Sequence, residues 1–327
     1  THMKKWSIVG FIALLAISIL AACGGGKDDS AKGGENKDTI TVKHAMGTEE
    51  RVPADPKRVV VLTNEGTEAL LELGIKPVGA VKSWTGDPWY KHIQADMKGV
   101  KQVGLEGEPN IEAIAELKPD LIIGNKMRHE KIYDKLEKIA PTVFSETLRG
   151  EWKDNFSLYA KAVNKEEKGK EVLEDFDKKV SELSDKLGDQ KKKRVSVVRF
   201  MAGQSRIYYK DSFPGIILDQ LGFKYPEKQE KLFEKQDDKF VFMTENKESI
   251  PEMDGDVLFY FTYKPAESKT EAETWQNDWT SDPLWKKLNA VKTGNAHEVD
   301  DAIWTTAGGV KAAYLFLDDI EKYFLKS

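Results

Sequence analysis

Residues 109–123 read PNIEAIAELKPDLII, and the pattern of this stretch decides the fold. The Pro-Asn pair at 109–110 predicts the start of a helix that continues to Leu117, because both residues are typical of helix N-termini. Pro119 ends this helix, and the apolar run at 121–123 predicts a strand. A short, unbroken apolar run suits a strand that is buried on both faces, as in a parallel sheet.

The same alternation of strand and helix surrounds this stretch on both sides. Short apolar runs predict the strands, and glycine or proline marks the ends of the helices. Such alternation is typical of an α/β sheet with largely parallel strands, and it predicts an N-terminal lobe over residues 39–150. The expected strands are 58–62, 78–81, 121–123 and 142–144, and the expected helices are 67–73, 109–117 and 131–139.

Residues 189–327 repeat this outline and predict a second α/β lobe. A valine-rich run opens it, as one opens the first lobe, and a helix ended by Gly222 follows. The expected strands are 194–200, 257–261 and 296–299, and the expected helices are 215–221 and 306–325.

The segment between the lobes, residues 151–188, has a different pattern. Apolar residues recur every three or four positions with lysine and glutamate between them. This spacing predicts one amphipathic helix of ~35 residues, or ~50 Å at 1.5 Å per residue, with Gly169 as the expected position of a bend. The predicted fold class is therefore α/β, with two Rossmann-like lobes that have central, mostly parallel sheets and are bridged by one long rigid helix. A junction between two such lobes is a favoured ligand site.

The N-terminal end has the three parts of a secretory signal. Lys4 and Lys5 are basic, residues 8–20 are almost entirely apolar, and small residues follow. The apolar run is short for a transmembrane helix. Residues 1–22 are therefore predicted to be a signal peptide, in which the two residues before Met3 are interpreted as a remnant of cloning.

Cys23 is the only cysteine, so it cannot form a disulfide within the chain. Its position after Leu20-Ala21-Ala22 resembles a bacterial lipobox, which implies cleavage before the cysteine and acylation of it. Two or more acyl chains give stable membrane attachment. Residues 23–38 are polar and glycine-rich, which predicts a lipidated flexible tether. We therefore expect a lipid-anchored protein on the extracellular face of the cell membrane; a plain signal peptide is the alternative.

Composition argues against several functions. The net charge is −5, and the one basic run in the mature chain, 191–194, lies at an expected helix end, so nucleic acid is not an expected partner. No nucleophile elbow, phosphate loop or His-Glu-x-x-His motif occurs, so an enzyme is not expected. The histidines are not spaced as metal ligands are, and His129 is the one candidate for a haem ligand. The five histidines are His2, His44, His92, His129 and His297.

Several different short motifs follow one another in a characteristic order from about residue 57 to 324. They lie at 56–60, 73–79, 108–112, 118–122, 282–285 and 302–304. In these motifs the chain resembles the siderophore- and cobalamin-type substrate-binding proteins of ABC importers. Within that family it is most similar to lipoproteins of Gram-positive bacilli that bind ferric hydroxamate or citrate–hydroxamate siderophores such as schizokinen. The resemblance implies a monomer with small lobe movements that delivers its ligand to an ABC permease dimer; a receptor for haem or cobalamin is the alternative.

A ferric siderophore places particular demands on a binding site. The chelator already fills the coordination sphere of the iron, so the protein needs aromatic walls and cationic donors, not metal ligands or a cofactor. Arginine suits paired carboxylate or hydroxamate oxygens, and the loops after strand ends are where such sheets bind ligands. These loops offer Trp84, Arg128, Arg199, Arg206, Tyr209, Phe213, Tyr263 and Lys264, with the three arginines as leading contacts. The resemblance adds Phe240 and Trp304 as pocket aromatics.

The chain departs from the family pattern at two points. Hydroxamate-binding relatives often carry an arginine just before the Glu-Pro-Asn motif, where this chain has Glu106. Relatives also present one surface glutamate per lobe to the permease. Glu130 fits this role in the first lobe, but Ile216 stands at the matching position of the second, where Asp219 is the nearest acid.

Overall fold

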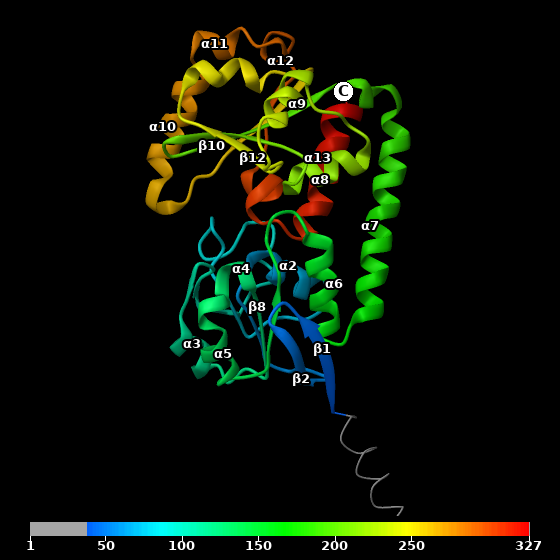
Figure 1. The fold of residues 1–327 in the computed structure, drawn as a ribbon, viewed down its shortest axis with the longest axis vertical. Coiled ribbons are helices and arrows are strands. Elements are labelled where there is room, and N and C mark those ends of the chain that lie inside the picture. Colours follow the sequence, from blue (N-terminus) through cyan, green and yellow to red (C-terminus); the bar gives the residue numbers. More distant parts are fainter. Residues whose placement is uncertain (1–37, 327) are drawn as a thin grey trace, which may run out of the picture.

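The computed structural model describes residues 38–326. In Figure 1 the two lobes are stacked along the long axis, with the N-terminal lobe below and the C-terminal lobe above. The predicted signal peptide, Cys23 and most of the predicted tether lie outside the described residues. Among the described residues, no helix combines the length and the apolar character needed to cross a membrane.

The N-terminal lobe is built on a five-stranded sheet in the order β5-β4-β3-β8-β9, and every pairing in it is parallel. The central strands β3 and β8 are fully buried, as their apolar sequences predict. The strands are β3 (Val59–Val61), β4 (Gly79–Ala80), β5 (Lys101–Gln102), β8 (Leu121–Asn125) and β9 (Thr142–Ser145). The helices are α2 (Asn64–Glu72), α3 (Ile111–Glu116), α4 (Lys126–His129), a 3₁₀ turn (Glu130–Ile132) and α5 (Tyr133–Glu137).

Two antiparallel hairpins in this lobe were not predicted. They are β1 (Thr39–His44) with β2 (Gly47–Pro53), and β6 (Gly104–Leu105) with β7 (Glu108–Pro109). Their residues are mostly exposed or half-buried, so they lack the unbroken apolar runs that mark the buried strands.

The C-terminal lobe contains a second five-stranded sheet, ordered β12-β11-β10-β13-β14. The pairings of β13 with β10 and β14 are parallel, whereas β10-β11 and β11-β12 are antiparallel. The strands are β10 (Val195–Met201), β11 (Gln204–Tyr208), β12 (Val241–Thr244), β13 (Val257–Thr262) and β14 (Ala296–Glu298). The predicted α/β class with mostly parallel sheets is confirmed. The antiparallel strands β11 and β12 make the sheet of this lobe a mixed one.

Helices cover the second sheet, and the last of them is shorter than the expected 306–325. A π-helix (Ala302–Thr306) precedes it and places its residues beside the other lobe. The α-helices are α8 (Phe213–Leu221), α9 (Glu227–Glu234), α10 (Lys269–Thr280), α11 (Pro283–Lys286), α12 (Asn289–Lys292) and α13 (Val310–Leu325). Three 3₁₀ segments are Gly188–Lys192, Lys247–Met253 and Ala266–Ser268.

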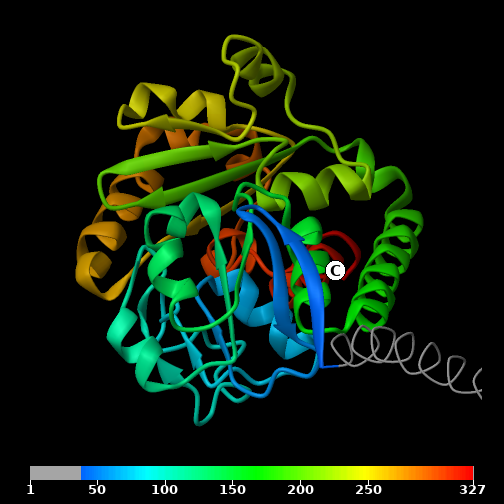
Figure 2. The same cartoon turned by 60° about the horizontal axis from the view of Figure 1, so that its bottom comes forward.

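A long helix spans both lobes as expected, but the prediction of one helix over 151–188 is wrong in extent. The segment forms α6 (Trp152–Ala162) and α7 (Glu166–Leu187), which pack against each other. Asn164 adopts a left-handed conformation with φ of 55°, and the Lys165 amide donates to the Ala160 carbonyl at 2.7 Å. Asparagine tolerates this conformation better than most residues, so the chain reverses here and not at Gly169. Figures 1 and 2 both show α7 running along one side of the two lobes.

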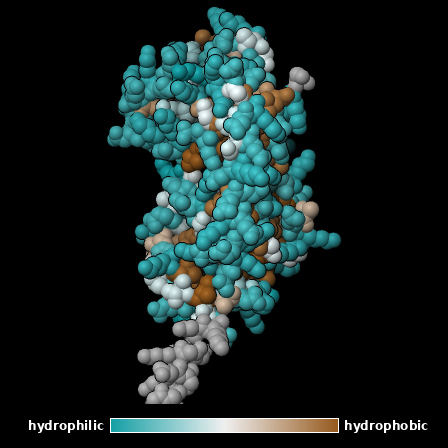
Figure 3. Space-filling model, turned by 90° about the vertical axis from the view of Figure 1, so that its right-hand side faces the viewer, coloured by the Kyte–Doolittle hydropathy of each residue, from teal (hydrophilic) through white to brown (hydrophobic). Residues whose placement is uncertain are grey.

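Direct contacts between α2 and α13 join the lobes a second time. The buried Glu68 carboxylate accepts a hydrogen bond from the Ala312 amide at 2.8 Å, and Lys311 pairs with Glu72 at 3.0 Å. A carboxylate near the first turn of α13 also stabilises the helix dipole. These bonds hold one relative orientation of the lobes. The face that carries α7 is mainly hydrophilic (Figure 3).

Candidate functional site

A cavity of about 380 Å³ lies between the two lobes. From the N-terminal lobe it is lined by residues that follow β3, β4, β8 and β9, which are the carboxyl ends of parallel strands. From the C-terminal lobe it is lined by β10, β11, the start of α8 and the loop before α13. Both lobes therefore contribute to one ligand-sized space.

The structure brings most of the expected ligand-binding residues to this cavity. All three leading arginines line it, Arg128 from the N-terminal lobe and Arg199 and Arg206 from paired strands of the C-terminal lobe, together with aromatic side chains from both lobes. The expected residues that line it are Trp84, Arg128, Arg199, Arg206, Phe213, Phe240 and Tyr263.

Tyr209, Lys264 and Trp304 do not line the cavity, contrary to expectation. Tyr209 stacks on Phe233 with ring centroids 4.2 Å apart, inside the core of the C-terminal lobe. Trp304 has no exposed surface and lies 4.1 Å from the ring of Phe316. Its indole Nε1 donates to Asp319 Oδ2 at 2.8 Å. Trp304 is a core residue because the π-helix turns its ring inward, onto α13.

Arg128 is held by Glu106. Its Nε atom lies 3.0 Å from Oε2 of Glu106, and the other Glu106 oxygen accepts from the Asn64 backbone amide at 2.8 Å. Burial raises the pKa of Glu106, and the Arg128 charge opposes that rise. The Arg128 guanidinium also lies 6.0 Å from the Trp84 ring. Arg128 lines the cavity, and its Nη groups have no hydrogen-bond partner among the described residues.

Arg199 is tied to the protein more completely. It forms a buried ion pair with Asp301, with Nε and Oδ1 2.8 Å apart, and its Nη1 donates to Tyr208 at 3.2 Å. Although burial disfavours the guanidinium charge, Asp301 raises the pKa of Arg199 above its usual range. The Tyr263 ring covers the guanidinium at 4.8 Å. Most of its donors are satisfied internally and its charge is matched by Asp301, so Arg199 shapes the cavity wall more than it offers free hydrogen bonds.

Arg206 differs from these two arginines. Its Nε donates to Gln204 at 2.7 Å and its Nη1 to Tyr208 at 3.3 Å. Within residues 38–326, no carboxylate lies within 4.0 Å of it. Arg206 is therefore a cation on the cavity wall that lacks a counter-charge from the described protein.

Sequence reasoning missed several lining residues. Arg149 follows β9 and lies over the Phe240 ring at 5.1 Å, with Asp238 3.4 Å away. Trp152 also lines the cavity, although its position on an amphipathic helix indicated only core packing. For Arg149, the rule that ligands bind after strand ends would have found it.

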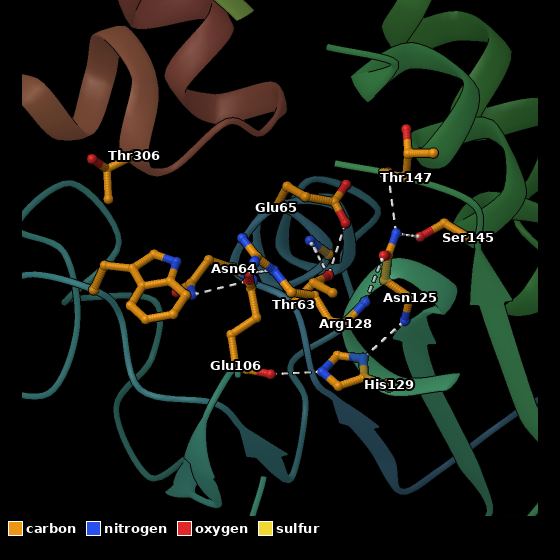
Figure 4. A network of polar contacts seen from close by, with 12 residues as sticks. Thr63, Asn64, Glu65, Glu106, Asn125, Arg128, His129, Ser145, Thr147 and Thr306 are labelled. Atoms are coloured by element: carbon orange, nitrogen blue, oxygen red, sulfur yellow. Dashed lines mark hydrogen bonds and ion pairs between the residues drawn. The ribbon is translucent and has the colours of Figure 1, made fainter. Parts of the chain in front are cut away.

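Glu65 is a further lining residue that was not expected. It follows β3 as the second residue of α2, and it is only 8% exposed. Burial raises its pKa to about 8, aided by Glu106 and Glu68 and opposed by hydrogen bonds from Tyr159 and Thr63. Figure 4 shows Glu65 on the N-terminal lobe, beside the network of Asn64, Glu106 and Arg128.

His129 is not available to a haem iron. It is 1% exposed; its Nδ1 accepts from the Asn125 amide at 3.0 Å, and its Nε2 lies 2.7 Å from the Glu106 carbonyl oxygen. Burial lowers its pKa to about 4. Among the described residues, no group of three or more His, Cys, Asp and Glu side chains is arranged to hold a metal ion.

The two expected docking acids lie on the surface of different lobes. Glu130 is exposed in the 3₁₀ turn after α4, and Asp219 is exposed near the end of α8. Their role remains a prediction.

Comparisons with known proteins give a consistent answer. The family described as periplasmic binding protein matches residues 59–302. The chain is 68% identical over 325 residues to the probable siderophore-binding lipoprotein YfiY of Bacillus subtilis, covering 99% of this chain and 100% of that one. It is 32% identical to the Fe(3+)-citrate-binding protein YfmC of Bacillus subtilis, covering 98% of both.

A solved structure agrees with these relatives. Staphylococcus aureus SirA complexed with staphyloferrin B matches with a TM-score of 0.78 and 39% identity, covering 87% of this chain and 98% of that chain. The family expected from the sequence motifs is thereby confirmed: this chain belongs to the periplasmic binding protein family.

Proposed function

We propose that this chain is the extracellular, lipid-anchored binding protein of an ABC importer and that it captures a ferric siderophore of the hydroxamate or citrate–hydroxamate class. The observation that carries this proposal is the cavity between the lobes, which four arginines line together with aromatic side chains. The names of the relatives, a siderophore-binding lipoprotein and a ferric-citrate-binding protein, support it.

The charges around the cavity favour an anionic ligand. The charges of Arg128 and Arg199 are matched by Glu106 and Asp301, whereas Arg206 has no such partner in the described part of the chain. Arginine donates planar pairs of hydrogen bonds to carboxylate or hydroxamate oxygens. A ferric complex that carries such oxygens on its outer face therefore fits this wall.

The iron would arrive as cargo with its coordination supplied by the chelator. Aromatic walls from Trp84, Phe213, Phe240 and Tyr263 then contact the apolar arms of the chelator. The relatives' names describe binding proteins, and one of them is a putative ABC transporter substrate-binding lipoprotein; this supports capture and release over catalysis.

Delivery and anchoring complete the proposal. Cys23 would carry the lipid, and Glu130 and Asp219 would face a permease dimer while the protein acts as a monomer. The contacts between α2 and α13 support a small lobe movement on binding, because opening the lobes would break the buried Glu68–Ala312 bond.

The test is a titration of the full chain in detergent micelles with ferric schizokinen, ferric citrate, haem and cobalamin. Tryptophan fluorescence reports binding, because Trp84 and Trp152 line the cavity. We expect quenching by a ferric siderophore at sub-micromolar concentration, with the ligand recovered unchanged. Quenching by haem or cobalamin alone would replace this ligand class, and indifference to every ferric complex would refute the proposal.

A further inference from the structure

The carboxyl group of Glu65 is bonded to the protein through one oxygen only. Its Oε1 accepts hydrogen bonds from the Thr63 hydroxyl at 2.8 Å and from the Tyr159 hydroxyl. Its Oε2 has no hydrogen-bond partner within residues 38–326, and Glu65 lines the cavity. Figure 4 shows the oxygen without a dashed line pointing away from Thr63.

Tyr159, which donates to Glu65, also belongs to a chain of hydrogen bonds that includes Ser145 and Asn125. The Asn125 side-chain oxygen accepts from the Arg128 amide, so its Nδ2 faces Ser145 Oγ, 2.8 Å away. An amide nitrogen can only donate, so Ser145 Oγ accepts from Asn125; it also lies 3.4 Å from the Gly124 carbonyl oxygen and 2.7 Å from the Tyr159 hydroxyl. Tyr159 donates to Oε1 of Glu65.

The two hydroxyl donors on Oε1 leave the other oxygen of Glu65 for an acid proton. Oε1 already receives two hydroxyl hydrogens, which occupy its two lone pairs. With both hydroxyls donating to Oε1, the acid proton resides on Oε2, the oxygen without a protein partner in the described structure. A protonated Glu65 thus presents an O–H donor to the cavity.

We propose that Glu65 is a ligand-contacting residue that binds the ferric complex as a neutral carboxylic acid and donates its Oε2 hydrogen to a ligand oxygen. This proposal rests on the function proposed above for the same cavity. An ionised carboxylate at this position would repel an oxygen-rich anion, whereas a neutral acid donates to it.

The surroundings of Glu65 favour its neutral form near pH 7. Glu68 on its own helix and Glu106 from the loop between β6 and β7 both repel a charge there, while Arg128 from α4 partly offsets Glu106. Tyr159 from α6 donates to the charged form, and the α2 N-terminus also favours a negative charge. Burial is the largest effect, and it raises the pKa of Glu65 to about 8.

The consequence is an affinity that depends on pH with a definite sign. If the ligand selects the protonated form, affinity is constant well below pH 8 and falls as pH rises through it, by up to about tenfold per pH unit. The Glu65→Gln variant keeps an oxygen for Thr63 and Tyr159 and presents an N–H to the cavity at every pH.

The experiment measures the affinity of the full chain in detergent micelles for ferric schizokinen from pH 6 to pH 9.5. Wild type, Glu65→Gln and Glu108→Gln are compared. Glu108 is exposed on β7, so the control substitution Glu108→Gln removes the same charge outside the cavity. We expect Glu65→Gln to bind like wild type at pH 6 and to bind more tightly than wild type above pH 8. Glu108→Gln should follow the wild-type pH profile. Titration of the ligand affects all three proteins equally, so it cancels in the ratio of a variant's affinity to that of wild type at the same pH.

The possible failures are distinguishable. A wild-type protein that binds no ferric complex refutes the proposed function itself. A wild-type protein that binds, together with a Glu65→Gln variant that has the same pH profile, overturns only the role of Glu65. If Glu65→Gln does not fold, calorimetry of the wild type in buffers of different ionisation enthalpy decides: uptake of a fraction of one proton on binding at pH 8.5 is expected, and no uptake overturns the role of Glu65.

Discussion

Oε2 of Glu106 lies 3.0 Å from Nε of Arg128, so a buried carboxylate is paired with an arginine of the cavity wall. Glu106 is buried and also accepts hydrogen bonds from the backbone and side-chain nitrogens of Asn64. Glu106 thus orients Arg128 and cancels its charge. The cavity is therefore less positive than its number of arginines indicates.

Replacing Glu106 with glutamine should change ligand selectivity. The variant removes one negative charge beside the cavity, and at ~8 Å with an effective dielectric constant of about 20 this is worth about 2 kcal/mol to an anion. Affinity for ferric citrate should rise roughly ten- to thirtyfold relative to a neutral ferric trihydroxamate. Titration of both complexes checks this, with Glu108→Gln as control. A parallel loss of affinity for both complexes would mean that Glu106 only maintains the local structure.

The Arg199–Asp301 pair should matter chiefly for folding. Arg199→Ala leaves Asp301 as an unpaired buried carboxylate, and such a change costs about 3–5 kcal/mol of unfolding free energy. Urea denaturation measures this cost. The double variant Arg199→Met with Asp301→Leu should lose less stability than either single change to alanine. A double variant that loses the sum of both would contradict this account.

Arg206 should show the opposite behaviour. Because no carboxylate pairs with it in the described structure, Arg206→Ala should leave the unfolding free energy nearly unchanged. It should weaken an anionic ferric complex by about 1.5–3 kcal/mol, the range for hydrogen bonds to charged groups. Lys264→Ala, which changes a cation outside the cavity lining, is the matched control for titration. Equal effects of the two variants would remove Arg206 from the site.

Substitutions of Trp304 and Trp84 should have different effects, the first on the unfolding free energy and the second on fluorescence quenching by the ligand. Trp304→Phe loses the hydrogen bond to Asp319 and leaves space in the core, so we expect about 1–3 kcal/mol lower unfolding free energy with ligand affinity retained. Trp84→Phe should keep stability and lose much of the fluorescence quenching, because Trp84 lines the cavity. Loss of affinity in Trp304→Phe without loss of stability would return Trp304 to the pocket.

Protonation of His129 should destabilise the protein in acid. Burial lowers its folded pKa to about 4, below the usual 6.5, so the native state binds fewer protons than the unfolded chain between these values. Unfolding free energy should therefore fall as pH falls from 6.5 to 4, by about 3 kcal/mol. His129→Gln should be less stable than wild type at pH 7, and the difference should narrow in acid. A difference that stays constant from pH 7 to pH 4.5 would contradict this.

The sequence was sufficient for much of the fold and for part of the site. Residues 121–123 form a strand because an unbroken apolar run is stable only when both faces are covered. Trp84 and Arg128 were found because they follow strands, where parallel sheets bind ligands. The break between α6 and α7 was missed, since Asn164 interrupts an apolar periodicity that continues on both sides.

Local pattern alone therefore determined the α/β class, the position of the main strands along the chain and the supply of arginines and aromatics at strand ends. Only the tertiary structure decided which of these side chains are free to bind. Arg199 and Asp301 are 102 positions apart in the chain, and Glu65 and Tyr159 are 94 apart. Charge pairing and burial depend on such distant contacts, and no periodicity or spacing in the sequence records them.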